Sequence, residues 1–426
     1  MELKKYKLGE ILDVTRGASL SGEFYATEGK YIRLTCGNFD YQNNCFKENK
    51  SKDNLYYIGD FKPEFLMEEG DIITPLTEQA IGLLGSTAII PESGKYIQSQ
   101  DVAKIICKEE LLDKDFVFYL ISSTLVKQQL SAAAQQTKIR HTSPDKIRDC
   151  TVWIPELTEQ KRIGKLLRSL DRKIELNRAI NQNLEAMAKQ LYDYWFVQFD
   201  FPNENGKPYK SSGGKMVWNE KLKREIPKGW NVLKLGEHCS FNKRTSNGYF
   251  NHPILYLDTS NITNNTIDEL QFLNPSSDII PSRARRLVQE GDIVYSTVRP
   301  NLKHFGIIMN PDYNMVVSTG FAVITANWSA YRYFIYQFLI QAATIENLST
   351  IAQSAVSAYP SINTSDIENL DLVVPPDSMI EKYAKTACRL YLQIDTNYKE
   401  IKSLTKQRDE LLPLLMNGQV SVNSDL

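Results

Sequence analysis

Two long segments of the chain repeat their apolar residues every three or four positions. The first runs from Thr158 to about Phe196, and the second runs from about Asp377 to Leu412, just before Pro413. This spacing predicts two helices that each pack against another helix along one apolar stripe. At ~1.5 Å per residue, the first helix would span roughly 58 Å. The two stripes consist of Ile163, Leu167, Leu170, Ile174, Leu184, Met187, Leu191 and Trp195, and of Tyr383, Ala387, Leu390, Ile394, Ile401, Leu404 and Leu411.

Each stripe also contains one asparagine near the middle of its helix, Asn177 in the first and Asn397 in the second. A single asparagine in an apolar seam costs stability but fixes the register of the pair. If the helices run antiparallel, their midpoints meet, so we predict that Asn177 and Asn397 lie close together at the crossing. The alternative is that both are exposed polar residues beside the stripes.

Short sequence matches recur in the same order in both halves of the chain, which is the signature of an internal duplication. Between the matches, short apolar runs alternate with Gly, Pro and Asn turns and with helical stretches at 111–130 and 328–348, a texture typical of α+β domains. The matches pair 7–10 (KLGE) with 234–237, 69–72 (EGDI) with 290–293, and 143–147 (SPDKI) with 364–367 (TSDI).

The predicted fold is therefore two similar α+β domains in a pseudo-two-fold tandem repeat, separated by two long antiparallel coiled-coil helices. Antiparallel pairing would place the two domains at opposite ends of the helical rod. The predicted boundaries are 1–155 for the first domain, 156–200 for the first helix, 201–229 for a basic linker, 230–376 for the second domain, 377–418 for the second helix and 419–426 for a C-terminal tail.

The composition is that of an ordinary globular protein. Lys and Arg number 50 against 51 Asp and Glu, for a net charge of −1, which argues against a protein that coats DNA but allows positive charge confined to one face. No apolar run reaches the ~20 residues of a membrane span. With no apolar signal segment after Met1, we expect a cytoplasmic protein without membrane contact. None of the six cysteines forms a Cys-x-x-Cys pair, so we expect reduced, buried thiols.

The sequence carries no recognisable catalytic motif. An amino-methyltransferase would show an Asn/Asp-Pro-Pro-aromatic tetrapeptide and a Gly-rich cofactor loop, and neither is present. A phosphate-binding Gly-x-x-x-x-Gly-Lys run and a metal-ligand spacing are also missing. The adjacent pair His238 and Cys239 lies in an amphipathic stretch and is a weak candidate for a dyad. We expect a chain that is not an enzyme and binds no metal or cofactor itself.

The helical and linker segments contain distinctive short motifs, namely 160–163 (QKRI), 169–178 (SLDRKIELNR), 183–188 (NLEAMA), 194–197 (YWFV), 199–202 (FDFP), 206–209 (GKPY), 225–230 (EIPKGW) and 411–418 (LLPLLMNG). With these motifs the chain resembles type I restriction–modification specificity (S) subunits. The resemblance covers the whole chain in architecture, but it is sharp only in roughly 155–230 and 370–420.

The resemblance implies that each α+β domain is a target recognition domain that reads half of a bipartite site in double-stranded DNA. The helices would space the two halves and bind two methyltransferase (modification) subunits, and the full complex would add restriction/translocase subunits. In that family the complex methylates adenine. S-adenosylmethionine, ATP and Mg²⁺ would belong to those partners.

Candidate DNA contacts are the polar and basic segments near strand ends, because phosphates demand Lys and Arg while base edges suit Arg, Lys, Asn and Gln. Each segment has the alternative interpretation of a solvated loop or surface charge run. In the first domain the candidates are Gln136, Lys138, Arg140 and His141; in the second they are Lys243, Arg244, Arg283, Arg285, Arg286, Arg299, Asn301 and Lys303.

Two other functions remain open from the residues. One is a structural protein that bridges partner proteins without binding DNA. The other, less favoured, is an unrecognised DNA methyltransferase or nuclease.

Overall fold

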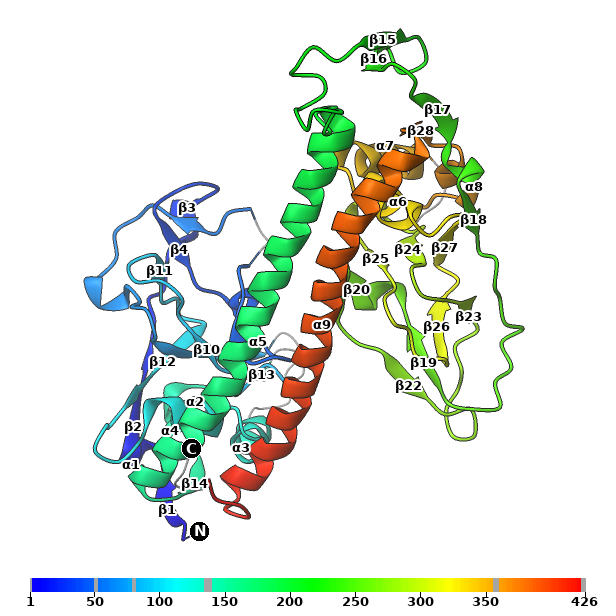
Figure 1. Cartoon of the computed structure of the whole chain (residues 1–426). Coiled ribbons are helices and arrows are strands. Elements are labelled where there is room, and N and C mark those ends of the chain that lie inside the picture. Colours follow the sequence, from blue (N-terminus) through cyan, green and yellow to red (C-terminus); the bar gives the residue numbers. More distant parts are fainter. Residues whose placement is uncertain (1, 50–52, 79–81, 134–139, 355–359, 423–426) are drawn as a thin grey trace. The chain divides into compact units, whose positions relative to one another are not determined.

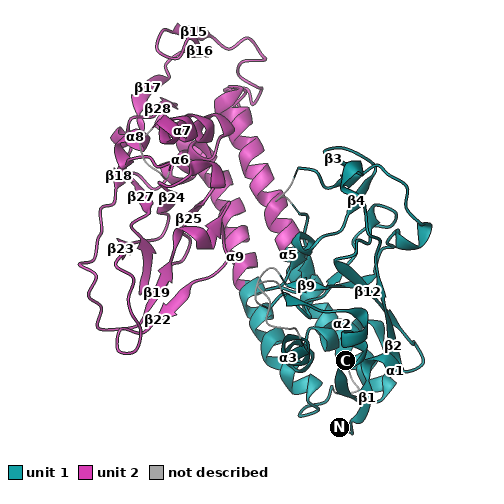
Figure 2. Cartoon of the chain, turned by 180° about the vertical axis from the view of Figure 1, so that it is seen from behind, with its two compact units in different colours: residues 1–177, 400–426 teal, residues 178–399 magenta. Residues whose placement is uncertain are grey.

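A computed structural model describes residues 2–49, 53–78, 82–133, 140–354 and 360–422. The chain divides into two compact units, which Figure 2 shows in different colours. Unit 1 comprises residues 1–177 and 400–426, and unit 2 comprises residues 178–399. Each unit therefore contains one α+β domain together with a part of each long helix.

The two long helices are α5 (Leu157–Tyr192) and α9 (Asp377–Met416), and they pair within each unit (Figure 1). In unit 1, Arg408 contacts Asp171 while Glu400 contacts Lys173, so the numbering rises along one helix as it falls along the other. In unit 2, Asn397 donates a hydrogen bond to Asn181. The predicted antiparallel pairing is confirmed in both units.

The helices differ from the prediction in two details. Helix α9 continues through Pro413 to Met416, because a proline in the last turn removes only one hydrogen bond of the ladder. The turn that follows the helix contains Gly418, whose positive φ of 70° suits a glycine. Met187 is 53% exposed, and its neighbour Ala188 is buried in its place. That single position of the predicted stripe was wrong by one residue.

Unit 1 is built on a four-stranded sheet in the order β10-β8-β12-β2, with a second sheet in the order β11-β4-β7-β3. Three short helices complete the domain: α2 (Lys114–Ile121), α3 (Thr124–Ala133) and α4 (Pro144–Arg148). Other elements are α1 (Leu8–Ile11), β1 (Lys4–Lys7), β2 (Leu12–Arg16), β3 (Tyr25–Ala26), β4 (Tyr31–Arg33), β5 (Phe39–Asp40), β6 (Cys45–Phe46), β7 (Tyr56–Tyr57), β8 (Ile72–Pro75), β9 (Thr77–Glu78), β10 (Ala88–Ile89), β11 (Tyr96–Ile97), β12 (Val102–Cys107), β13 (Arg140–His141) and β14 (Thr151–Ile154), with 3-10 turns η1 (Gly22–Phe24), η2 (Cys36–Asn38) and η3 (Pro63–Phe65).

Unit 2 has the corresponding sheets β18-β27-β24-β25 and β22-β19-β26-β23. Helices α6 (Tyr331–Leu339) and α7 (Ala342–Ser354) lie beside the first sheet in Figure 1, and α8 (Thr364–Glu368) precedes the last strand of the unit, β28 (Asp371–Val374). The strands are β15 (Met216–Asn219), β16 (Arg224–Pro227), β17 (Asn231–Lys234), β18 (Cys239–Phe241), β19 (Ile254–Leu257), β20 (Ile262–Thr263), β21 (Thr266–Ile267), β22 (Gln271–Leu273), β23 (Ala284–Leu287), β24 (Ile293–Ser296), β25 (Phe305–Ile307), β26 (Met315–Ser318), β27 (Phe321–Ala326) and β28 (Asp371–Val374). The π-helical turn η4 (Asp193–Val197) follows α5, and the 3-10 turns are η5 (Leu235–Glu237), η6 (Thr259–Asn261) and η7 (Pro300–Leu302).

The two units share the strand order of the first sheet, which confirms the tandem α+β repeat. In both units a second four-stranded sheet contains one parallel pair, β4 with β11 and β19 with β26, but its edge strand differs, because β3 borders β7 whereas β23 borders β26. Both also close with an antiparallel pair that joins the start of the domain to the strand before the long helix, β1 with β14 and β17 with β28. The helical stretches at 111–130 and 328–348 are each divided into two helices.

Each unit has its own hydrophobic core. In unit 1 the first sheet packs on α2 and on the start of α5, and Leu415, Met416 and Val422 from the far end of the chain join this core. In unit 2 the core extends from the sheet through α6 to aromatic residues of both long helices, including Tyr192 and Tyr383. No helix within the described ranges carries an apolar stretch long enough for a bilayer crossing.

Candidate nucleic-acid interface

In unit 1, the candidate segment that ends in His141 pairs with the strand that follows β8. Arg140 of β13 stands opposite Glu78 of β9, and His141 stands opposite Thr77. The Arg140 Nη1 donates to Ser131 Oγ at 3.0 Å and lies 3.6 Å from Glu78 Oε2. The structure thus places both residues at a sheet margin, where Arg140 is half exposed. Gln136 and Lys138 lie outside the described residues.

In unit 2, the loop after β24 occupies the corresponding place. Val298 bridges to Ser361, and the Arg299 N–H donates to the Pro360 carbonyl at 2.9 Å. The turn η7 follows directly and leads through Asn301 to Lys303. The side chains of Arg299, Asn301 and Lys303 are all exposed.

The backbone of this loop is unusual, because Arg299 and Lys303 have φ values of 47° and 58°. Left-handed conformations are costly for residues other than glycine and persist where the surroundings enforce them. At the position corresponding to Lys303, unit 1 has Gly82 with a φ of 93°. Both units therefore have a left-handed residue at this position, and in unit 2 that residue is a lysine.

Two hydrogen bonds establish the correspondence between the units. The Thr142 N–H donates to the Leu76 carbonyl at 2.9 Å, and the Ile362 N–H donates to the Thr297 carbonyl at 2.8 Å. Position 78 therefore matches 299, and position 140 matches 360. Candidates that the sequence placed in unrelated segments occupy one common site on the repeated fold.

The other basic candidates of unit 2 also come together. Residues 244–246 pair with β23: the Ser246 N–H donates to the Arg285 carbonyl and the Leu287 N–H donates to the Arg244 carbonyl. This pairing sets Lys243 and Arg244 beside Arg285 and Arg286. Arg283, Arg285 and Lys243 are exposed, whereas Arg286 is partly buried, and this burial lowers its pKa.

Arg244 is committed to the interior of unit 2. Its guanidinium lies 2.6 Å from the carboxylate of Asp292, which is fully buried, and it also contacts Gln289. In unit 1 the corresponding Asp71 pairs with Lys104 of β12. Arg244 therefore neutralises a buried aspartate, a role that the sequence did not reveal because the two residues lie far apart in the chain.

The two basic groups of unit 2 flank one turn. The Thr319 N–H donates to the Arg283 carbonyl, and the Thr297 N–H donates to the Gly320 carbonyl, both at 2.9 Å. Arg283 and the segment that begins at Thr297 are thus joined through residues 318–320. Together these residues form a continuous basic margin, which we call the unit 2 margin.

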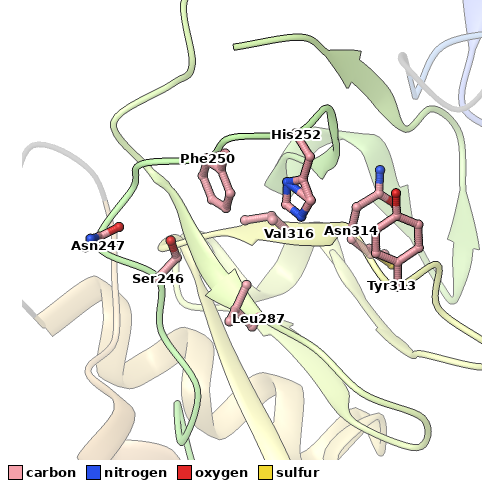
Figure 3. Close-up of a pocket in the computed structure, with 9 residues that line it drawn as sticks. Ser246, Asn247, Phe250, His252, Leu287, Tyr313, Asn314 and Val316 are labelled. Atoms are coloured by element: carbon pink, nitrogen blue, oxygen red, sulfur yellow. The ribbon is translucent and has the colours of Figure 1, made fainter.

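A pocket of about 340 Å³ adjoins the paired segment 244–246, and Figure 3 shows its lining residues. The His252 ring lies 6.4 Å from the Phe250 ring, nearly parallel to it, and 6.0 Å from Tyr313. Tyr313 is 90% exposed. This aromatic group lies at the ends of β19 and β26 and contributes shape rather than charge to the surface.

Burial dominates the surroundings of the candidate dyad, His238 and Cys239. Burial raises the pKa of the Cys239 thiol to about 12 and lowers the pKa of His238, so neither residue of the adjacent pair is activated for nucleophilic chemistry. The Cys239 thiol donates to the Leu235 carbonyl at 3.2 Å. Within the described ranges, no three His, Cys, Asp or Glu residues gather as metal ligands would.

Both seam asparagines are buried, with 6% exposure for Asn177 and 5% for Asn397. The interpretation that they are exposed polar residues was therefore wrong. Within unit 1, Asn177 donates to Glu400 at 2.8 Å; within unit 2, Asn397 donates to Asn181 at 2.8 Å. Their direct meeting stays a prediction.

The seam is more polar than the apolar stripes indicated. Asp171, Asn181 and Arg408 are also buried in it. The helical spacing does place Asp171 three residues before Ile174 and Asn181 four residues after Asn177, on the same side of the helix as the seam. Polar and charged side chains are mostly exposed in proteins, so the sequence alone favours an exposed position for both.

Two copies of one α+β unit, each carrying polar segments at the same margin and joined by paired helices, define a two-module recognition protein. A family model described as the type I restriction modification DNA specificity domain matches residues 1–186 and 227–406. The chain belongs to this family, that of the specificity subunits of type I restriction–modification systems.

Individual relatives agree with this assignment. The type I restriction enzyme MjaIX specificity subunit from Methanocaldococcus jannaschii is 25% identical over 334 residues, which cover 76% of this chain and 73% of that protein. The HindI specificity subunit from Haemophilus influenzae is 28% identical over 171 residues, or 39% of this chain and 36% of that protein. The crystal structure of an S subunit from M. genitalium has the same fold, with a TM-score of 0.58 at 16% identity, and the match covers 98% of this chain and 96% of that one.

Proposed function

We propose that this chain reads a bipartite target in double-stranded DNA, one half with each α+β unit. The observation that carries the proposal is the placement of Arg140 and His141 in unit 1 and of Arg299, Asn301 and Lys303 in unit 2. Segments without sequence similarity occupy the same margin of a duplicated fold. A duplicated margin that carries different side chains in each unit suits two half-sites of different sequence.

The long helices have the role of a spacer and an assembly platform in this proposal. They would bind two methyltransferase subunits that modify adenine, and restriction/translocase subunits would complete the nuclease. S-adenosylmethionine, ATP and Mg²⁺ would be bound by those partners. The near-neutral net charge of −1 supports this division, because a chain without excess positive charge needs partners to supply much of the phosphate contact.

The experiment is a selection from a library of duplex DNA with randomised positions, using the full chain in complex with its methyltransferase subunits. The wild-type complex should enrich a motif of two separated halves. Replacing Arg299, Asn301 and Lys303 together by alanine should erase one half and leave the other. Enrichment of no motif would favour a bridging protein without DNA binding.

Two controls separate the remaining functions. The isolated chain with labelled S-adenosylmethionine should transfer no methyl group to duplex DNA, whereas transfer would mean that this chain is itself a methyltransferase. A triple alanine variant at the exposed residues Lys62, Glu64 and Glu92 of unit 1 should leave both halves of the motif intact.

A further inference from the structure

The candidate segments of the two units share one pair of positions that face each other across neighbouring strands. In unit 1, Glu78 on the first strand faces Arg140 on the second. In unit 2, the corresponding residues are Arg299 and Pro360, which are joined by the backbone hydrogen bond of 2.9 Å. Each unit therefore presents one arginine at this pair, but the arginine comes from opposite strands.

The guanidinium of Arg140 is held in a fixed direction. Glu78 lies 3.6 Å from Nη1 on one side, and Ser131 Oγ accepts a hydrogen bond from the same nitrogen at 3.0 Å. The side chain of Arg140 is 42% exposed, while that of Glu78 is only 6% exposed. The buried carboxylate thus lies beside Nη1, while the arginine side chain as a whole stays partly accessible to a ligand.

Glu78 is itself anchored, yet half of its carboxylate is unused. Oε1 accepts a hydrogen bond from the Gly82 N–H at 2.9 Å, whereas Oε2 is buried and has no hydrogen-bond donor among the described residues. A buried carboxylate oxygen without a donor is costly. This cost is relieved if Arg140 Nη1 moves from 3.6 Å to hydrogen-bond distance of Glu78 Oε2 when the guanidinium binds a ligand.

Arg299 is fixed by its backbone. Arg299 follows β24 in the left-handed conformation, and its N–H donates a hydrogen bond to the Pro360 carbonyl. The next residue is Pro300, whose ring fixes its own φ. The matching position on the opposite strand is a proline and offers no carboxylate. Unit 2 thus constrains the main chain at its arginine, whereas unit 1 places an acidic residue opposite its arginine.

We infer that Arg140 and Arg299 each read a guanine, one in each half-site, and that Glu78 is a positioning residue for Arg140. This inference rests on the proposed function. The planar fork of an oriented arginine matches the O6 and N7 acceptors of guanine in the major groove, and no other base offers two acceptors there. A lysine keeps the charge but loses the fork.

The test uses the same full complex and randomised duplex library, with three single variants. Arg140→Lys should reduce the preference for guanine about 10-fold or more at one position of one half-site. Glu78→Gln keeps the side-chain volume and should weaken the preference at that same position by a smaller factor. Arg299→Lys should act on one guanine in the other half-site only.

Arg148→Lys is the matched control, since Arg148 is an arginine of unit 1 that also pairs with carboxylates, Asp13 and Asp145. Its motif should equal that of the wild type, and thermal unfolding should show all four variants folded. The inference is overturned if a half-site contains no guanine, or if folded Arg140→Lys and Arg299→Lys complexes keep every base preference. A wild-type complex that enriches no motif would instead overturn the proposed function.

Discussion

At one corresponding position of the long helices, unit 1 buries a charge where unit 2 buries an aromatic ring. Asp171 of α5 accepts hydrogen bonds from Tyr119 of α2 at 2.5 Å and from Arg408 of α9 at 2.9 Å. In unit 2 the equivalent residue is Tyr391, which accepts a hydrogen bond from Gln337 of α6 at 2.7 Å and stacks on Tyr333 at 4.8 Å. The residue equivalent to Arg408 is the buried Ala188.

The contrast shows that the repeated fold requires a contact between the domain helix and the long helix, but not one chemistry. Burial and the charge of Asp171 raise the pKa of Tyr119, so its hydroxyl stays a donor. Burial alone would lower the pKa of Arg408, but the carboxylates of Asp171 and Asp409 raise it. A buried ion pair of this kind favours one register over others while adding little net stability, whereas the rings of unit 2 contribute apolar area.

The largest effect is expected from Arg408→Ala, which leaves Asp171 buried without its cation. Breaking one partner of a buried pair costs about 3–5 kcal/mol. Hydrogen exchange on the full chain should show loss of protection in α2 and in the paired parts of α5 and α9 in unit 1. Arg162→Ala, which removes an arginine half exposed on α5, is the control and should have little effect.

Replacing both charges sharpens the comparison by giving unit 1 an apolar contact like that of unit 2. The double variant Asp171→Leu with Arg408→Met should recover most of the loss and fall within about 1–2 kcal/mol of the wild type. Denaturant unfolding of Asp171→Leu, of Arg408→Met and of the double variant gives the coupling energy between the two side chains. Equal losses in the double variant and in Arg408→Ala would mean that the pair contributes through packing rather than charge.

A smaller loss is expected in unit 2 from Tyr391→Phe. This change keeps the ring stack but leaves the Gln337 amide, which is 1% exposed, without its acceptor. An unsatisfied buried amide costs about 1–3 kcal/mol. Denaturant unfolding should show the loss, and Tyr398→Phe, whose hydroxyl contacts the exposed Thr266, should cost less.

The smallest effect concerns Glu185 of α5, for which unit 1 has the neutral Thr405 at the matching position. Burial raises the pKa of Glu185, and the hydrogen bond from Asn265 only partly opposes this. Because the folded-state pKa lies above the unfolded value of 4.5, ionisation disfavours the folded state, so stability falls as pH rises through the interval between the two. Glu185→Gln should flatten this slope above pH 4.5 in thermal unfolding, and an unchanged slope would contradict the assignment.

The periodic features of this molecule were predictable and the long-range ones were not. Helical spacing and the repeated Lys-Leu-Gly-Glu and Glu-Gly-Asp-Ile segments predicted both long helices and the duplication, since these signals are local. The cross-strand pairing of Glu78 with Arg140 joins residues far apart in sequence, and no periodicity reports it. The same holds for the ion pair of Arg244 with Asp292, since the sequence offered Arg244 as a candidate DNA contact, and for the ion pair of Arg408 with Asp171.

The division of the chain has a consequence for its synthesis. Unit 2 is one continuous stretch, 178–399, whereas the core of unit 1 includes Leu415, Met416 and Val422 from the other end of the chain. A ribosome that builds the protein from its N-terminus releases every residue of the second module before the first can complete its core. The module encoded first is thus the last to finish folding, and until then α2 and the start of α5 expose apolar surface that chaperones can bind.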